Sequence, residues 1–167
     1  MPEVPALETE NRGATGIRAD GTSAVAIINS GFEAMDLKIR TDARVTLLDV
    51  TEKVNDAVAR SGVRSGLCNL FVPHTTAGII VSENWDPDVT HDMLAQFEKI
   101  VPRDGRYRHG EGNSQAHILS VMVSTSINIP VRNGRLALGR WQGVMFAEFD
   151  GPRERGLNVT VVAEEER

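Results

Sequence analysis

The chain has 167 residues, of which 41% are hydrophobic and 25% charged, and its net charge is -5. These are the proportions of a soluble globular domain, and the acidic excess argues against a nucleic-acid-binding surface, which needs clustered lysine and arginine. Its longest apolar runs are about half a dozen residues, far short of the roughly 20 that cross a bilayer, so we expect no membrane span. Residues 1–11 lack the pattern of a secretory signal and Cys68 is the only cysteine, so we expect a reducing cytoplasm without disulfides.

The first part of the chain differs in composition from the rest. It carries Pro2, Pro5, Gly13 and Gly16 with several glutamates and few large apolar side chains. Such a composition buries too little surface to offset the entropy of ordering. We therefore predict a flexible or loosely docked N-terminal extension over residues 1–32, with a possible strand at 24–28, and one domain over residues 33–167.

Strands are predicted where apolar and polar residues alternate, or where short apolar runs lie between turn residues. The first two are expected to pair across the turn Thr41-Asp42. Asn133-Gly134 is a typical two-residue hairpin turn. The predicted strands span residues 37–40, 44–50, 66–72, 76–82, 116–125, 127–131, 135–138, 142–150 and 156–163.

Two helices are predicted. The first begins at the N-cap Thr51 and ends at Ser61-Gly62. The second has Asp86 as its cap and Pro87 at its first position, and it ends before Pro102. Two early helices and a β-rich second half predict an α+β fold, with a mostly antiparallel β-sandwich core covered by two main helices.

All four histidines fall between residues 74 and 117. His74, His109 and His117 are expected at loop or strand ends, where three imidazoles can converge on zinc or a similar divalent ion and leave one position open. Carboxylates such as Glu83, Asp86 and Glu111 can complete that shell. The alternative is that each is an ordinary hydrogen-bonded histidine, because their spacing matches no short metal motif.

Other polar segments have both a structural and a functional interpretation. Helix capping explains Asp86, whereas Glu83 and Asn84 precede the cap and can face a cleft as a general base and its neighbour. The segment Gly110-Glu111-Gly112-Asn113-Ser114 offers backbone N–H groups to an anion, or is simply a surface connection.

Further candidates for ligand binding also have both a structural and a functional interpretation. Thr75 and Thr76 are either ordinary β-formers or ligand contacts, and Trp141 is either a core residue or the wall of a pocket. Arg153 or Arg155 can reach an anion from the turn that begins at Asp150. A Ser-His-Asp hydrolase is not supported, since no serine lies in a nucleophile-elbow sequence.

Five segments, in order along residues 37–162, together resemble the YjbQ-like family, also called the secondary thiamine-phosphate synthase enzyme family. A sixth, Glu148-Phe149-Asp150-Gly151-Pro152-Arg153, is similar too. The five are Pro73-His74-Thr75-Thr76-Ala77-Gly78-Ile79; Glu83-Asn84 with Asp86-Pro87-Asp88-Val89; Tyr107-Arg108-His109 with Gly112-Asn113-Ser114 and Ala116-His117; Ile129-Pro130-Val131; and Leu138-Gly139 with Trp141-Gln142-Gly143.

The resemblance implies a compact α+β fold, a homotrimer with clefts near subunit contacts, and a weak synthase activity. That reaction couples a pyrimidine pyrophosphate to a thiazole phosphate and releases pyrophosphate. By position, His74, His109 and His117 match the family's histidines, and Glu83, Asn84, Asp86 and Glu111 match its polar cluster. Trp85 departs from the family pattern of a small residue or cysteine, and residues 1 to about 33 have no counterpart.

We therefore expect a cytoplasmic homotrimeric enzyme that acts on a phosphorylated small metabolite with a divalent metal, zinc or magnesium. The alternatives are a non-catalytic metal- or metabolite-binding protein and a metal-dependent phosphoester hydrolase. The expected catalytic residues are Glu83, Asn84, Asp86 and Glu111, and the expected metal ligands are His74, His109 and His117. The expected substrate contacts are Thr75, Thr76, Arg108, Asn113, Ser114, Arg140, Trp141, Gln142 and Arg153, with the three arginines as anion contacts.

Overall fold

The structure is a computed structural model that describes residues 15–17, 23–25 and 32–165, and the chain divides into two compact units, residues 1–30 and 31–167. In the first unit, β1 (Thr15–Ile17) pairs with β2 (Ser23–Val25) in an antiparallel ladder. The strand predicted at 24–28 overlaps β2, and its last three residues lie outside the described ranges. So does most of the predicted N-terminal extension.

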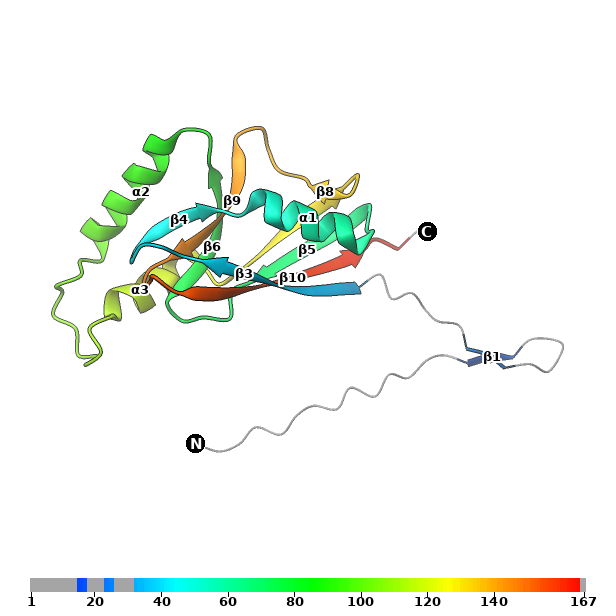
Figure 1. The fold of residues 1–167 in the computed structure, drawn as a ribbon, viewed down its shortest axis with the longest axis horizontal. Helices are drawn as coiled ribbons and strands as arrows, with labels where there is room; N and C mark the ends of the chain where they lie inside the picture. Colours follow the sequence, from blue (N-terminus) through cyan, green and yellow to red (C-terminus); the bar gives the residue numbers. More distant parts are fainter. Residues whose placement is uncertain (1–14, 18–22, 26–31, 166–167) are drawn as a thin grey trace, which may run out of the picture. The chain divides into compact units, whose positions relative to one another are not determined.

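The second unit contains two antiparallel sheets and three helices, which confirms the predicted α+β class (Figure 1). One sheet has five strands in the order β3 (Phe32–Arg40), β10 (Glu154–Ala163), β5 (Ser65–Phe71), β7 (Ser126–Arg132) and β8 (Arg135–Leu136). The other has three, in the order β4 (Thr46–Asp49), β9 (Gln142–Glu148) and β6 (Ala77–Glu83). The helices are α1 (Thr51–Ser61), α2 (Pro87–Ile100) and α3 (Ser114–Val123).

The larger hydrophobic core brings together both sheets and α1. Leu70 and Val159 of the five-stranded sheet pack in one cluster with Ile79 and Phe146 of the three-stranded sheet and with Val54 of α1. All five side chains are essentially inaccessible to solvent. Burial of this apolar surface is the main force that holds the two sheets together.

A second core contains residues of the three-stranded sheet, α2 and α3. Met145 and Ala147 of β9 pack there with Leu119 of α3 and Phe97 of α2. The intervening Phe146 belongs to the larger core, so β9 is buried on both faces. A strand with two buried faces has a continuous apolar run rather than an alternating pattern.

Several turn and cap signals in the sequence are confirmed. Gly62 ends α1 in the left-handed conformation, with φ of 72°. Asp86 caps α2 by accepting a hydrogen bond of 2.9 Å from the Asp88 N–H, and Pro87 opens the helix. Asn133 and Gly134 both have positive φ, as the hairpin between β7 and β8 requires.

Three local predictions are wrong. The strand predicted at 116–125 is the third helix, α3, whose apolar run includes exposed Ile118, Val121 and Met122. With apolar residues on nearly every side, its sequence shows no helical period. The strands predicted at 37–40 and 44–50 lie in different sheets, since β3 pairs with β10 and β4 with β9. Thr51 is the first helical residue rather than the N-cap, and its hydroxyl donates to Asp49.

The helices in the described ranges include none with the length and apolar character needed to cross a membrane.

Candidate functional site

Strand β6 separates the candidate residues into two groups. Thr75 and Thr76 directly precede this strand, and Glu83 is its last residue. Because seven residues of extended chain span about 20 Å, the residues at the two ends of β6 lie far apart. We call the two groups the histidine end, around the start of β6, and the tryptophan end, around its finish.

A polar cavity of about 370 Å³ lies at the histidine end. Its walls come from the segment between β5 and β6, the start of α3 and the turn between β9 and β10. We call it the histidine cavity. Its lining residues are Pro73, His74, Thr75, Thr76, Glu111, Asn113, His117, Asp150, Arg153 and Arg155.

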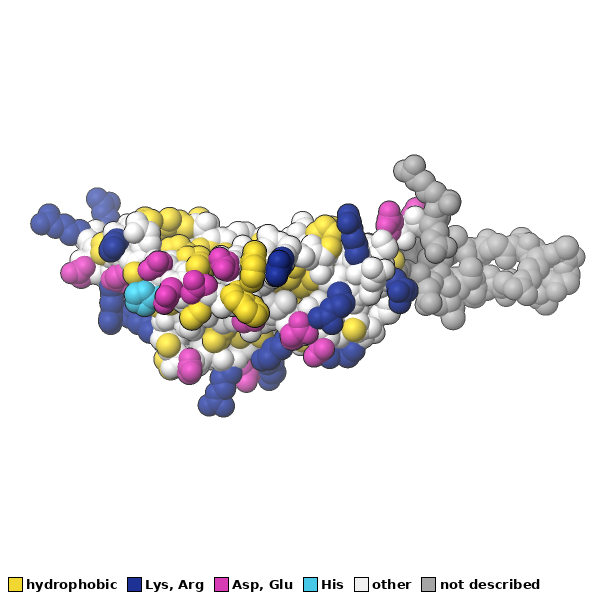
Figure 2. Space-filling model, turned by 90° about the horizontal axis from the view of Figure 1, so that it is seen from above, with side chains coloured by type: hydrophobic (Ala, Val, Ile, Leu, Met, Phe, Trp, Pro, Cys, Tyr) yellow, Lys and Arg dark blue, Asp and Glu magenta, His cyan; other side chains and the backbone are white. Residues whose placement is uncertain are grey.

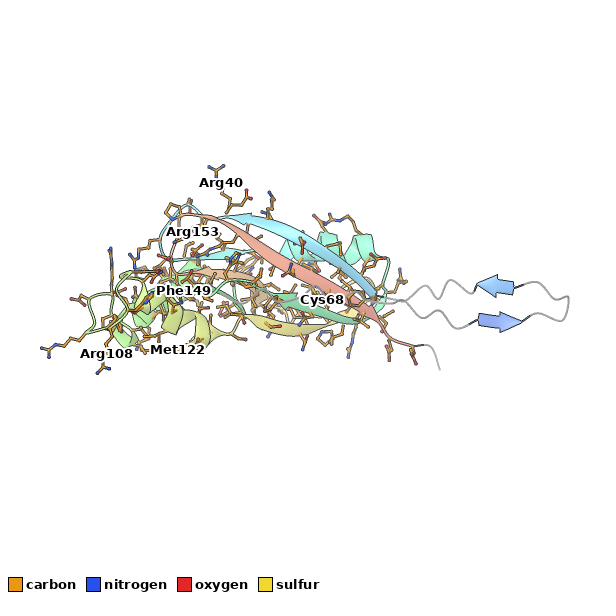
Figure 3. The ribbon with its side chains drawn as sticks, turned by 90° about the horizontal axis from the view of Figure 1, so that it is seen from below. Arg40, Cys68, Arg108, Met122, Phe149 and Arg153 are labelled. Carbon is orange, nitrogen blue, oxygen red and sulfur yellow. The ribbon has the colours of Figure 1, made fainter. Side chains whose placement is uncertain are left out.

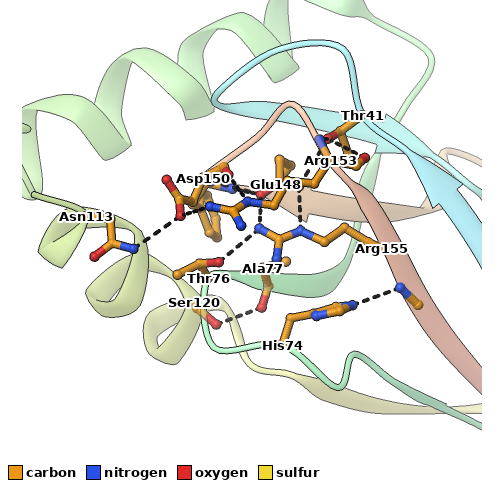
Figure 4. A network of polar contacts seen from close by, with 12 residues as sticks. Thr41, His74, Thr76, Ala77, Asn113, Ser120, Glu148, Asp150, Arg153 and Arg155 are labelled. Carbon is orange, nitrogen blue, oxygen red and sulfur yellow. Dashed lines mark hydrogen bonds and ion pairs between the residues drawn. The ribbon is translucent and has the colours of Figure 1, made fainter. Parts of the chain in front are cut away.

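A buried ion pair lies at the wall of this cavity (Figure 4). The Arg155 guanidinium binds both carboxylate oxygens of Glu148, with Nε to Oε2 at 2.7 Å, and it donates to Thr76 Oγ1 at 2.9 Å. Glu148 is fully buried and Arg155 is 6% exposed. Glu148 also accepts hydrogen bonds from the Thr41 hydroxyl and from the N–H of Asp150. A charge held by this many partners has a fixed position.

The sequence names Arg155 only as an alternative to Arg153 as an anion contact, and it does not predict that Glu148 is the partner of Arg155. The sequence does contain a signal for this ion pair. In β10 every second side chain is buried, and Arg155 occupies the same inward-facing register as Leu157 and Val159. A charged residue in that register needs a buried partner. Glu148, the acid that ends the apolar run of β9, is that partner.

Arg153 is held by a second, more accessible ion pair. Its Nη2 lies 2.6 Å from Asp150 Oδ2, and its Nε donates to the Asp150 carbonyl. Asn113 Nδ2 donates to the same carboxylate oxygen at 3.2 Å, which connects the start of α3 to this turn. The Arg153 side chain is 52% exposed, so it can contact a ligand in the cavity without leaving Asp150.

His74 accepts a backbone hydrogen bond. The N–H of Gly156 donates to His74 Nε2 at 2.8 Å, so the neutral ring carries its proton on Nδ1. The pKa of His74 is lowered from 6.5, first by burial and then by the positive charge of Arg155, with Glu148 opposing. The neutral imidazole is thus the form that this environment favours.

A second cavity of about 490 Å³ shares His117 with the first. The rings of His109 and His117 meet edge to face with centroids 5.4 Å apart, and His109 Nε2 lies 3.6 Å from a carboxylate oxygen of Glu111. The second cavity is lined by Tyr107, Arg108, His109, Ser114, His117 and Ile118.

The three predicted imidazole ligands do not fit a metal ion as they stand. His109 and His117 are neighbours, but the Nε2 lone pair of His74 is occupied by the Gly156 N–H. Within the described ranges, His, Cys, Asp and Glu side chains form no group of three that could hold a metal ion.

The start of α3 has unfilled hydrogen-bonding capacity. No side chain caps this helix. Asn113 Oδ1 and Ser114 Oγ are buried and have no hydrogen-bond partner among the residues that the structure describes, although buried polar atoms are almost always paired. The first N–H groups of a helix and its positive dipole end favour an anion.

The remaining predicted site residues lie at the tryptophan end. Asn84 Nδ2 donates to Asp49 at 2.7 Å, and Gln142 accepts from the Gly139 N–H at 2.7 Å. Asp86 serves as the helix cap. The structure therefore does not bring this group to the histidines within one chain. The group comprises Glu83, Asn84, Asp86, Arg140, Trp141 and Gln142.

Comparison with known proteins gives consistent matches over the second unit. Residues 35–164 match the family model described as UPF0047 protein YjbQ-like. The chain is 42% identical over 127 residues to UPF0047 protein MJ1081 of Methanocaldococcus jannaschii, a match that covers 76% of this chain and 92% of that protein. It is 47% identical over 120 residues to UPF0047 protein YugU of Bacillus subtilis, covering 71% and 91%.

Solved structures agree with these sequence matches. A YjbQ/UPF0047 protein of Clostridium acetobutylicum superposes with a TM-score of 0.75 at 45% identity, covering 77% of this chain and 99% of that one. A protein of Sulfolobus solfataricus, described as YbjQ-like and of unknown function, gives 0.76 at 29% identity, covering 80% and 98%. None of these four names states an activity.

Proposed function

Because the chain belongs to the YjbQ-like UPF0047 family and its histidine cavity is lined by imidazole and guanidinium groups, we propose that it is an enzyme acting on a phosphorylated small molecule. The observation that carries the proposal is the uncapped start of α3, with buried and unpartnered oxygens on Asn113 and Ser114. Asn113 and Arg153 are among the residues that line the histidine cavity, Ser114 is among those that line the second cavity, and His117 lines both.

The proposed position of the phosphate follows from charge. The helix N-terminus supplies N–H groups and a partial positive charge, and Arg153 supplies a guanidinium that can bind phosphate oxygens in pairs. Arg155 adds to the positive potential, as its lowering of the His74 pKa indicates. Its own charge is balanced by Glu148, so Arg153 is the principal anion contact.

The specific reaction that we propose is that of the family resemblance, the coupling of a pyrimidine pyrophosphate to a thiazole phosphate. Arg153 and the start of α3 would stabilise the negative charge of the departing pyrophosphate. His117 and Glu111 line the same cavity, and in this proposal they would move protons. Glu83, Asn84 and Asp86 have no part in this scheme within one chain.

Matched histidine variants test this function. We expect His117→Asn to lower kcat/KM for the two thiamine precursors about a hundredfold, and Arg153→Met to act mainly on KM. The control is His91→Asn, whose ring on α2 is 80% exposed and which should leave the rate unchanged.

The outcomes distinguish the alternatives. Cleavage of p-nitrophenyl phosphate that depends on His117 would indicate a phosphoester hydrolase. Phosphate binding without turnover of either substrate would indicate a binding protein. Equal activity of the His117→Asn and His91→Asn variants would contradict the proposed site.

Zinc or magnesium binding, a homotrimer and a cytoplasmic location stay predictions. Metal analysis of the purified protein tests the first, and light scattering tests the second. A cytoplasmic location agrees with the unpaired Cys68.

A further inference from the structure

The two tryptophans form an exposed aromatic pair at the tryptophan end. Trp85 is 77% exposed and Trp141 is 46% exposed, and their rings meet edge to face with centroids 5.8 Å apart. Tryptophan is rarely so accessible on a protein surface, and it is enriched where proteins bind one another. These two are the only tryptophans of the chain.

Backbone contacts fix the loops that carry the two rings. The N–H of Asn84 donates to the carbonyl of Trp141 at 3.2 Å. Asn84 Nδ2 donates to Asp49 and packs so closely on Gly143 that a Cβ there would lie 2.2 Å away. A surface that is ordered before binding loses little entropy when a partner arrives.

The charge around this pair is mostly negative. Residues 83–92 contain Glu83, Asp86, Asp88 and Asp92, and no lysine or arginine. The Arg140 guanidinium lies 4.8 Å from the centre of the Trp141 ring, so one indole already holds a cation of this chain. Figure 2 shows hydrophobic side chains on this face, bordered by a row of acidic ones and by a basic side chain.

We propose that the tryptophan surface, defined as Trp85, Trp141, Asp86 and Asp88, docks an arginine-bearing peptide segment of a partner protein. Guanidinium groups stack on indole faces and pair with carboxylates in the same geometry, and Arg140 already shows the first of these contacts. Together with Asp92, the carboxylates of Asp86 and Asp88 follow the first turns of α2 over about 9 Å, which suits several cations along a peptide rather than one small molecule. The same charges repel nucleic acid.

The intrinsic fluorescence of the full chain tests the proposal directly, since its whole tryptophan signal comes from this surface. The probe is a peptide of repeated Arg-Gly-Ser units. We expect a saturable change in emission that weakens as salt is added, and no response to the same peptide with glutamate in place of arginine. Trp85→Ala should weaken binding about tenfold, as expected for an interface anchor, with Trp141 still reporting.

Two further variants separate specific docking from general charge attraction. Phe32→Ala removes another exposed aromatic ring, 54% accessible, and should leave the affinity unchanged. Asp88→Asn should weaken binding and reduce its salt dependence. The proposal is overturned if the peptide gives no saturable response or binds the Trp85→Ala variant equally well. It is also overturned if light scattering shows that Trp85→Ala dissociates an oligomer, since the surface would then face a second copy of this chain.

Discussion

At the scale of single residues, the pair of Glu148 and Arg155 is the most constrained element of the histidine end. Replacement of Glu148 by glutamine would leave the guanidinium of Arg155 buried, at 6% exposure, without its counter-charge. Breaking a buried pair from one side costs about 3–5 kcal/mol. We expect Glu148→Gln to lower the free energy of unfolding by that amount in urea titrations.

The matched control for this variant is Glu154→Gln. Glu154 pairs with Lys38 at 3.0 Å, with side chains 62% and 81% exposed. An exposed pair contributes at most about 1 kcal/mol. Equal losses in the two variants would show that burial does not determine the strength of the first pair.

His74 should make stability depend on pH. Its pKa in the folded chain is lowered from 6.5, chiefly by burial, so the unfolded chain takes up a proton first as the pH falls. The contribution of neutral His74 is therefore complete above the unfolded pKa and is lost as the pH falls below 6.5. Between pH values of about 7.5 and 5.5, Tm should fall more for the wild type than for His74→Gln. Parallel curves would contradict this account.

At the scale of elements, a substitution of Gly62 tests whether its left-handed backbone conformation ends α1. It has φ of 72°, and a Cβ there would meet no atom within 4 Å, so only the backbone conformation opposes a side chain. We expect Gly62→Ala to cost about 1 kcal/mol in unfolding experiments. Gly110 is equally open but has no left-handed φ, and Gly110→Ala should be neutral or slightly stabilising. A neutral Gly62→Ala would mean that α1 does not end at this residue.

Signals between neighbouring residues predict the helix ends and turns well. They predict poorly which strands pair across long stretches of sequence. Asp86, Pro87 and the turn Asn133-Gly134 act through their own backbone, so their consequences are readable from neighbouring residues. Strand β3, in contrast, finds its partner in β10, more than a hundred residues later. The sequence of helix α3 resembles that of a buried strand because the exposed face of the helix is also apolar.

At the scale of the whole molecule, Cys68 lies on β5, inside the five-stranded sheet (Figure 3). Its side chain is inaccessible, and burial raises the pKa of its thiol to about 12. Thiol reagents attack the thiolate, so labelling should require global unfolding and follow its rate. Labelling by 5,5′-dithiobis(2-nitrobenzoic acid) with and without urea measures this, and fast labelling of the native chain would contradict the described core.

The structure brings together only part of the predicted set of site residues. His74 and His117 do line one cavity with Thr75, Glu111 and Arg153. The residues from Glu83 to Asp86 do not join them, because β6 carries its two ends apart. Proximity along the chain indicated chemistry at both ends but could not show that they are separate.

The shallow burial of helix α2 determines when this helix unfolds locally, relative to the rest of the domain. It has no fully buried residue, and Met93, Leu94 and Phe97 are only partly covered where they pack on the second core. Helix α1, by comparison, buries Val54, Ala57 and Val58 completely. Amide protons of α2 should thus exchange with deuterated solvent when this helix detaches locally. Amide protons of α1 should exchange only when the two sheets separate.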